Sequence, residues 1–273
     1  MRITNKYMGD NLVEAIRRST EKLAKIQHEV STGKKVNRLS DDPISSARIL
    51  DYDALIKAAD QFKRNTEFGL AWAQQTESAL DSASSILIRI KQLAVYQSTD
   101  TANAQTRKAT ANEVWNLYDE LLRLGNTKFQ GRYIFSGFLT DKQPFGRQPD
   151  NSIIYNGDSN EIEIHISENE KVPINLIGSE VFQGVGIFGI DIFSVVKNVA
   201  EAMESDDRDK IAAEIENLGY SIDQINQERA KIGSRINRFQ DNIQFIDDYK
   251  TNLTDLLSQL EDTDMADAMT RLA

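Results

Sequence analysis

The chain has 273 residues, of which 40% are hydrophobic and 27% charged, with four Pro, no Cys and a formal net charge of −10. No uninterrupted apolar run reaches about 18 residues, so we expect no segment that spans a membrane. The first ten residues contain no apolar stretch of the Sec signal type. The acidic balance argues against nucleic acid as a partner, and the lack of Cys excludes disulfides and thiol chemistry.

The charge is distributed unevenly between the two ends of the chain. Residues 1–40 contain nine Lys or Arg and four Asp or Glu, whereas residues 241–273 contain two and eight. Ends of opposite sign could attract each other or neighbouring copies of the chain. Solvated faces that merely differ in composition explain the same counts equally well.

The first helix is expected over residues 10–32, with Gly33 as its stop. Its apolar residues recur in alternating steps of four and three, which is the spacing of a coiled-coil seam. Because the chain offers this stripe no full partner, we expect the segment to become ordered mainly when neighbouring subunits cover it. The candidate assembly residues are Leu12, Ile16, Leu23, Ile26 and Val30.

A second helix is expected from Pro43 to about residue 97. Asp42 can cap its first turn, and Pro43 takes the first helical position, where the missing N–H costs nothing. The adjacent Asp41 and Asp42 also suggest a metal or acid–base site, but no His or third carboxylate lies nearby, which favours capping. The expected seam is rich in small residues: Phe62, Thr66, Gly69, Ala73, Thr76, Leu80, Ala83, Leu87, Ile90 and Ala94.

A third helix of about residues 103–125 precedes a region of different composition. The third helix carries one apolar stripe, and after Asn126 the chain becomes rich in aromatic residues and glycine. Strands are then predicted at 152–155, at 161–166 and, as an edge strand because of Pro173, at 172–177. Residues 140–190 are therefore expected to form a small β-rich insertion. The stripe consists of Thr110, Val114, Leu117, Leu121 and Leu124.

Residues 184–189 match the pattern GxGxxG, which is found where dinucleotides bind. A dinucleotide fold would need a second strand after the following helix, yet the next forty residues read as helical. The bulky Ile187 and Phe188 also favour packing, so we expect no dinucleotide site.

The last third of the chain reads as a helix of residues 191–204 followed by a long helix of residues 208–260. From Leu218 to Leu260, eleven of thirteen positions in the four-three register are apolar. Six consecutive heptads predict one strand of a coiled coil, on the order of 65 Å long. The acidic tail places Met265, Met269 and Leu272 on one helical face. The register is Leu218, Ile222, Ile225, Arg229, Ile232, Ile236, Phe239, Ile243, Ile246, Lys250, Leu253, Leu257 and Leu260.

Nothing in the sequence indicates catalysis, a cofactor or a metal. The two histidines, His28 and His165, stand alone on their elements, and no nucleophile elbow, metal spacing or phosphate loop accompanies them. We expect a mainly α protein whose N- and C-terminal parts form an antiparallel coiled-coil rod. Residues 41–139 and 191–260 are the expected rod, 140–190 the β insertion, and 1–40 with 261–273 the terminal assembly segment.

Three stretches are similar to the flagellin superfamily. They are Met1–Thr4, residues 31–43 with Asp41, Asp42 and Pro43, and residues 262–266. Residues 131–138, followed by Thr140–Asp141 and Pro144–Phe145, narrow the resemblance to the hook-associated protein 3 (FlgL) family, whose members join the flagellar hook to the filament. Its motif residues are Gly131, Arg132, Tyr133, Phe135 and Gly137.

The resemblance implies a non-enzymatic, extracellular structural subunit of the bacterial flagellum, exported unfolded through the flagellar type III apparatus. It implies that the terminal segments form the innermost layer, the long helices the next layer, and that the β unit faces outward. The implied partners are hook-associated protein 1, flagellin, further copies in a junction ring and an export chaperone. Relatives continue past the position of Leu272 with an amphipathic segment, so self-assembly and chaperone binding are expected to be weakened in a chain that stops at Ala273.

Two alternatives remain at this stage. The chain could be a minor flagellin that extends the filament, although residues 131–138 argue against that. It could also be a general coiled-coil scaffold whose β unit at 140–190 binds a sugar or a peptide.

Overall fold

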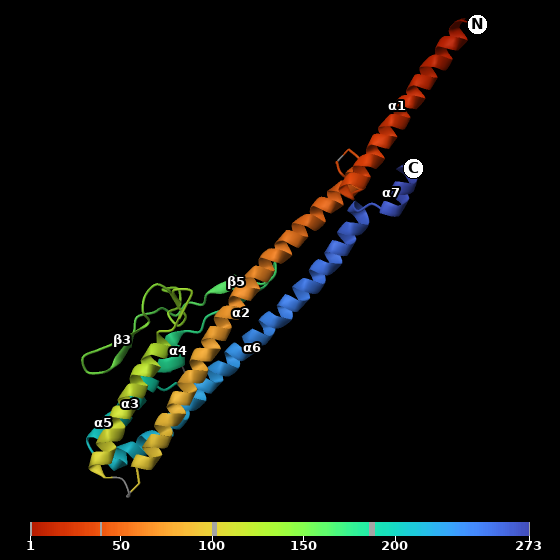
Figure 1. Cartoon of the computed structure of the whole chain (residues 1–273). Helices are drawn as coiled ribbons and strands as arrows, with labels where there is room; N and C mark the ends of the chain where they lie inside the picture. Colours follow the sequence, from red (N-terminus) through yellow and green to blue (C-terminus); the bar gives the residue numbers. More distant parts are fainter. Residues whose placement is uncertain (1, 39, 100–102, 186–188, 273) are drawn as a thin grey trace. The chain divides into compact units, whose positions relative to one another are not determined.

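The computed structural model describes residues 2–38, 40–99, 103–185 and 189–272. It contains two compact units, a terminal unit of residues 1–61 and 245–273 and a central unit of residues 62–244. The division falls inside the two longest helices, α2 and α6 (Figure 1). The helices are α1 (Arg2–Thr32), α2 (Pro43–Gln97), α3 (Ala104–Gly125), α4 (Gly178–Gln183), α5 (Ile192–Glu204), α6 (Arg208–Glu261) and α7 (Met265–Leu272). The strands are β1 (Lys128–Phe129), β2 (Arg132–Tyr133), β3 (Phe145–Arg147), β4 (Ile153–Tyr155), β5 (Glu163–His165) and β6 (Lys171–Pro173).

In the central unit, α2 and α6 pair antiparallel along the predicted seam. Thr66 forms a hydrogen bond with Asn242, and Ser84, further along α2, forms one with Asn226, which comes earlier in α6. The two helices therefore run in opposite directions. Every second seam residue of α6 in this unit is fully buried, and the alternate positions are half-buried. The polar exception Arg229 is explained by ion pairs to Glu77 and Asp81, both at 2.7 Å. The fully buried members are Leu218, Ile225, Ile232 and Phe239.

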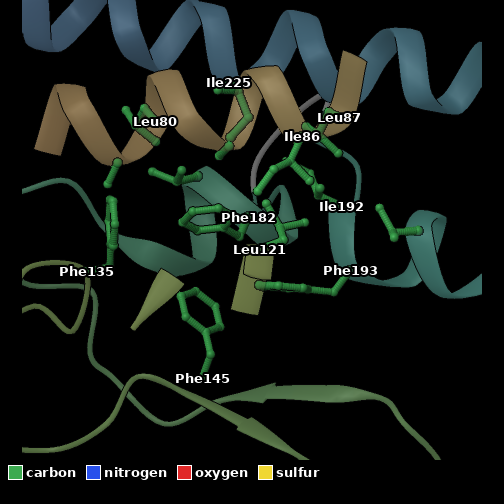
Figure 2. Close-up of a cluster of buried hydrophobic side chains, with 14 of the residues drawn as sticks. Leu80, Ile86, Leu87, Leu121, Phe135, Phe145, Phe182, Ile192, Phe193 and Ile225 are labelled. Atoms are coloured by element: carbon green, nitrogen blue, oxygen red, sulfur yellow. The ribbon is translucent and has the colours of Figure 1, made fainter. Parts of the chain in front are cut away.

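The core of the central unit is an aromatic cluster beside this helix pair (Figure 2). Phe182 of α4 stacks on Phe193 of α5 with ring centroids 5.6 Å apart, and Phe145 meets both rings within 5.4 Å. Leu121 of α3 is buried in the same cluster. Rings in offset or edge-to-face contact contribute stability beyond their buried area. This cluster joins the inserted region to the helices.

The β structure consists of three separate two-stranded antiparallel sheets, β1–β2, β3–β4 and β5–β6. The expected strands correspond to β4, β5 and β6, but with shorter bounds. The sequence analysis missed β1, β2 and β3, which lie in stretches without the alternation of apolar and polar residues that predicts a strand. The prediction of a mainly helical chain with long helices and a small β-rich insertion is confirmed.

In the terminal unit, α1 is longer than expected, because it begins at Arg2 rather than at residue 10. Gly9 does not stop it, since a glycine inside a helix costs only about 1 kcal/mol. Ile49, Ile246 and Leu253 are buried in this unit, and Lys250 of α6 forms an ion pair of 2.6 Å with Asp60 of α2.

The described part of the chain contains neither a membrane span nor a metal-binding cluster. No helix there is long and apolar enough to cross a membrane. The described residues also contain no group of three or more His, Cys, Asp or Glu side chains able to hold a metal ion. Of the GxGxxG stretch, Gly186, Ile187 and Phe188 lie outside the described residues. Gly184 ends α4 in the left-handed conformation, with φ of 59°.

Candidate assembly surface

The candidate assembly residues of α1 divide into an exposed group and a partly covered group. Leu12 is 63% exposed, Ile16 59% and Leu23 43%, whereas Ile26 and Val30 are half-buried. An amphipathic helix normally hides its apolar stripe, because burial of such side chains stabilises it by roughly 1.5–3 kcal/mol each. The first two thirds of α1 therefore carry a stripe that is left in solvent.

Helix α7 contacts α1 within the terminal unit (Figure 1). Only one α7 residue, Ala268, is buried. The face expected for the tail remains partly open, with Met265 39%, Met269 56% and Leu272 39% exposed. Flexible Met side chains adapt to varied partner surfaces. The terminal unit thus presents apolar side chains from both ends of the chain.

A backbone clasp joins the loop after α1 to the end of α6. Lys34 and Asp262 form an isolated antiparallel bridge, in which the Lys35 N–H donates to the Glu261 carbonyl at 2.8 Å and the Thr263 N–H to the Gly33 carbonyl at 2.9 Å. Gly33 permits this turn with φ of 74°. The Lys34 ammonium donates to the Glu261 carboxylate at 2.5 Å, and this hydrogen bond raises the pKa of Lys34.

Asp41 and Asp42 act as local backbone acceptors, as expected of capping residues. Asp42 Oδ1 accepts the N–H groups of Ile44 and Ser45, both at 3.1 Å, at the start of α2. A hydrogen bond from the Ser45 hydroxyl, followed by these N–H groups, lowers the pKa of Asp42. Asp41 Oδ2 accepts the Arg38 N–H at 2.9 Å and so shapes the loop itself. Pro43 is the first residue of α2.

The motif of residues 131–137 lies in the central unit, and its role there is structural. Gly131, with φ of 83°, makes the turn between β1 and β2, while Arg132 is exposed and Tyr133 half-buried. Phe135 is fully buried against Phe182, with ring centroids 5.3 Å apart. The motif therefore serves to anchor its loop in the core.

Gly137 is fixed by close packing on a neighbouring loop. A Cβ at this position would lie 1.9 Å from Asp158 Oδ1. That same oxygen accepts the Phe138 N–H at 2.8 Å. Burial opposes ionisation of Asp158, but the N–H donors of Phe138 and Asn160 outweigh it and hold its pKa below the usual value.

The clasp is the functional feature that sequence reasoning missed. It brings the motif around Lys34 against the motif around Asp262, two stretches that the sequence analysis treated separately. The opposite charges of the two ends were the available signal, and the Lys34–Glu261 pair shows that part of that charge is used within one copy. The candidate residues of α1 belong to the terminal unit, and Gly131–Gly137 belong to the central unit.

Comparison with known proteins gives matches along almost the whole chain. Flagellar hook-associated protein 3 of Escherichia coli K12 is 23% identical over 97% of this chain and 89% of its own length. A flagellin of Halalkalibacterium halodurans is 25% identical over 90% of this chain and 79% of its own length. The crystal structure of the flagellar junction protein FlgL from Legionella pneumophila covers 80% of this chain and all of its own, with a TM-score of 0.65 at 16% identity, and so shares the fold.

Two family models match the helical parts found at the two ends. The bacterial flagellin N-terminal helical region matches residues 3–140, about half of the chain. The bacterial flagellin C-terminal helical region matches residues 215–273. These ranges include α1, α2 and α3 on one side and most of α6 with α7 on the other. The chain belongs to the bacterial flagellin family.

Proposed function

We propose that the chain is a non-enzymatic structural subunit of the bacterial flagellum, of the hook-associated protein 3 type. In this role it stands between hook-associated protein 1 on the hook side and flagellin on the filament side, in a ring of its own copies. Secretion through the flagellar type III apparatus, with a chaperone holding the C-terminal part beforehand, belongs to the same proposal. The alignment with hook-associated protein 3 over most of both chains supports this assignment.

The exposed stripe of α1 is the single observation that carries the proposal. Leu12 and Ile16 are more than half exposed on a helix that has little cover of its own. Isolated helices are marginally stable in water, because most helical stability comes from packing of the apolar face. Neighbouring subunits that covered the stripe would bury it and order the helix in one step. Assembly would then be coupled to folding.

A capping experiment on flagellar ends tests the proposal. Fluorescently labelled chain is added to hooks that end in hook-associated protein 1, followed by flagellin. We expect a limited number of copies to bind each end, no growth from the chain alone, and filament growth only after flagellin is added. Failure to bind any hook or filament end would contradict the proposal.

A matched pair of variants links binding to the stripe. Ile16→Asp places a charge within the stripe, whereas Asn11→Asp places the same charge on another face of α1. Burying an unpaired carboxylate is costly, so Ile16→Asp should lose end binding by roughly a hundredfold or more while Asn11→Asp keeps it. Equal binding by the two variants would exclude the stripe as the assembly surface.

A filament subunit is the second candidate, because the flagellin of H. halodurans also matches 90% of this chain. A flagellin adds to its own end indefinitely. Continued elongation of filament seeds by the purified chain alone would therefore favour this candidate over the junction role.

A further inference from the structure

A stripe of large apolar side chains is exposed on α6 in the terminal unit. Phe245 is 66%, Tyr249 39% and Leu256 43% exposed, whereas their neighbours Ile246 and Leu253 are buried. The Phe245 and Tyr249 rings lie nearly parallel, with planes 2° apart and centroids 6.3 Å apart. Steps of four and seven residues place the three exposed side chains on one helical face. We call Phe245, Tyr249 and Leu256 the outer α6 stripe.

The exposed part of the α1 stripe has the same spacing. Leu12, Ile16 and Leu23 also follow one another in steps of four and seven residues. Each of the two sets therefore extends over about 16.5 Å of helix. Helices with the same heptad spacing can pack along one shared seam. The two stripes match in length and in period.

The charges beside the two stripes are opposite in sign. Asp248 and Asp255 stand on one edge of the outer α6 stripe and are exposed. Arg18, Lys22 and Lys25 stand on one edge of the α1 stripe and are also exposed. Charges along the edges of a helical seam set the partner and its orientation. The two stripes are therefore complementary in charge along a row of residues.

The other charges nearby do not cancel these two edges. Glu14 and Glu21 lie on the side of α1 opposite its stripe, and their ion pairs within α1 are exposed. Such pairs contribute little, so Arg18, the partner of Glu14, can turn toward another carboxylate. Glu29 is on the basic edge, but it comes after the exposed part of the stripe and is half-buried. On α6, Lys250 is held by its ion pair with α2.

An antiparallel arrangement brings the two charged edges together. When Leu23 lies level with Phe245, Lys22 lies within about 3 Å of Asp248 along the axis. The uncharged edge of α1, at positions 13, 20 and 27, then faces the side of α6 that packs on α2. A parallel arrangement would turn the basic edge away from Asp248. The charges therefore favour the antiparallel arrangement.

Helix α1 of the same copy cannot cover the outer α6 stripe in this way. The clasp holds Lys34 beside Asp262 at the end of α6, and α1 leads away from that point past the end of α6 (Figure 1). Leu23 precedes Lys34 by eleven residues, so the exposed part of α1 lies beyond α6 in its own copy. A second copy shifted along the helix axis brings the two stripes together.

We infer that the exposed α1 stripe of one copy docks antiparallel on the outer α6 stripe of a second copy. The rings of Phe245 and Tyr249 are the anchors, since aromatic residues within a polar rim carry most of the binding energy at interfaces. The two stripes are different surfaces, so the contact is heterologous and builds closed rings or open helical arrays rather than two-fold dimers. The inference rests on the proposed function, because it names the surface that covers the α1 stripe during assembly.

Cross-linking tests the contact directly, since the chain has no Cys of its own. Full-length chains carrying Ser19→Cys, within the α1 stripe, are mixed with chains carrying Asn252→Cys, within the outer α6 stripe, and treated with a short bis-maleimide. In the antiparallel pair these positions lie within about 5 Å along the axis. The control pair is Gln27→Cys with Gln259→Cys, two exposed positions that the antiparallel pair keeps about 27 Å apart.

We expect at least about tenfold more heterodimer from the first pair than from the control pair. Equal yields would overturn the inference. A chain that carries both Ser19→Cys and Asn252→Cys should cross-link between chains. A cross-link formed only within single chains would show that α1 folds back on its own α6, and would also overturn the inference.

Variants of the outer α6 stripe separate the apolar and ionic parts of the contact. Adding Phe245→Ser should reduce the heterodimer about tenfold without changing the melting temperature, because Phe245 is exposed. Tyr220→Ser removes an exposed ring from α6 in the central unit and should leave the yield unchanged. Lys22→Asp should reduce the yield severalfold, and Asp248→Lys in the partner chain should restore it. A yield that ignored Phe245→Ser would overturn the contact.

The two proposals can fail separately. If labelled chain still binds hook ends and Ile16→Asp still abolishes that binding, the junction role stands even when no cross-link forms. If the cross-link forms but no flagellar end is bound, the contact between the stripes stands and the junction role falls.

Discussion

The terminal and central units treat their apolar side chains in opposite ways. The terminal unit holds about a third of the chain but few of the fully buried hydrophobic residues among the described ones. Fifteen of the twenty-four large hydrophobic side chains that are exposed in the described part of the chain lie in it. The central unit contains the aromatic cluster and nearly all of the buried seam residues of α2 and α6. Among the described residues of the terminal unit, the buried hydrophobic ones are Ile49, Ala59, Ile246, Leu253 and Ala268.

This difference separates a part that buries most of its apolar side chains from a part that leaves many of them in solvent. Burial of apolar surface is the dominant favourable term in folding, so the central unit has what a stable domain needs. The terminal unit leaves many large apolar side chains exposed in a single copy, and so gains less stability from burial. The two motifs are divided between the units, because Gly131–Gly137 lies in the central unit and Gly33–Pro43 in the terminal unit.

Hydrogen exchange on the isolated chain should show the largest effect. We expect amides of α1 before Leu23 to exchange at least about a hundredfold faster than those of α3 and α5, because opening α1 uncovers little apolar surface. Mass spectrometry of peptides from both regions measures the difference. Strong protection throughout residues 10–32 would refute the division into a stable and an incomplete unit.

A pair of identical truncations should differ almost as clearly. Leu121→Ala removes a fully buried side chain of α3 and should lower the free energy of unfolding by about 2–5 kcal/mol. Leu12→Ala removes a side chain that is 63% exposed and should change that free energy by less than about 0.5 kcal/mol. Urea denaturation followed by circular dichroism measures both. Equal losses would mean that α1 is packed in the single copy.

Two glycines with positive φ sharpen the comparison within the central unit. Gly137→Ala should cost more than about 2 kcal/mol, because the new Cβ would strike Asp158 in addition to the backbone strain. Gly131→Ala meets open space and should cost only about 1 kcal/mol from its φ of 83°. Thermal unfolding of the two variants gives the order. A milder effect at Gly137 would show that the loop around Gly137 adjusts easily.

The clasp should give the smallest effect. Its ion pair is nearly half exposed on the Lys34 side, so Lys34→Ala should cost at most about 1 kcal/mol. Because the pKa of Lys34 is raised on folding, the stabilisation is present below the ordinary lysine pKa and is lost as the pH rises through the raised value. Unfolding measured between pH 8 and pH 12 should show this loss in the native chain and not in Lys34→Ala. The same pH profile in both would show that the ion pair does not stabilise the folded chain.

The long helices could be predicted from the sequence because a helical period repeats over many residues. The seam of α6 follows from this period, whereas its polar members Arg229 and Lys250 depend on ion pairs with Glu77, Asp81 and Asp60 of α2, which the period does not show. The start of α2 was also predictable, since Asp42 and Pro43 act within one turn.

The short strands and the clasp could not be predicted in this way. The pairing of β3 with β4 depends on tertiary contacts around Phe145 rather than on local alternation. The bridge between Lys34 and Asp262 links backbone groups, which have the same chemistry at every residue. The exposure of Phe138 likewise depends on where Asp158 lies.

The division of the terminal unit between the two ends of the chain has a kinetic consequence. Its clasp joins residues separated by 227 positions, whereas the central unit is one continuous stretch. Closing a long loop early in folding is entropically costly and slow. When a chain is delivered N-terminus first, its central unit can fold before the rest. Helix α1 gains its partial cover only after α7 has also been delivered. The connectivity of the two units thus favours folding of the central unit before the terminal unit.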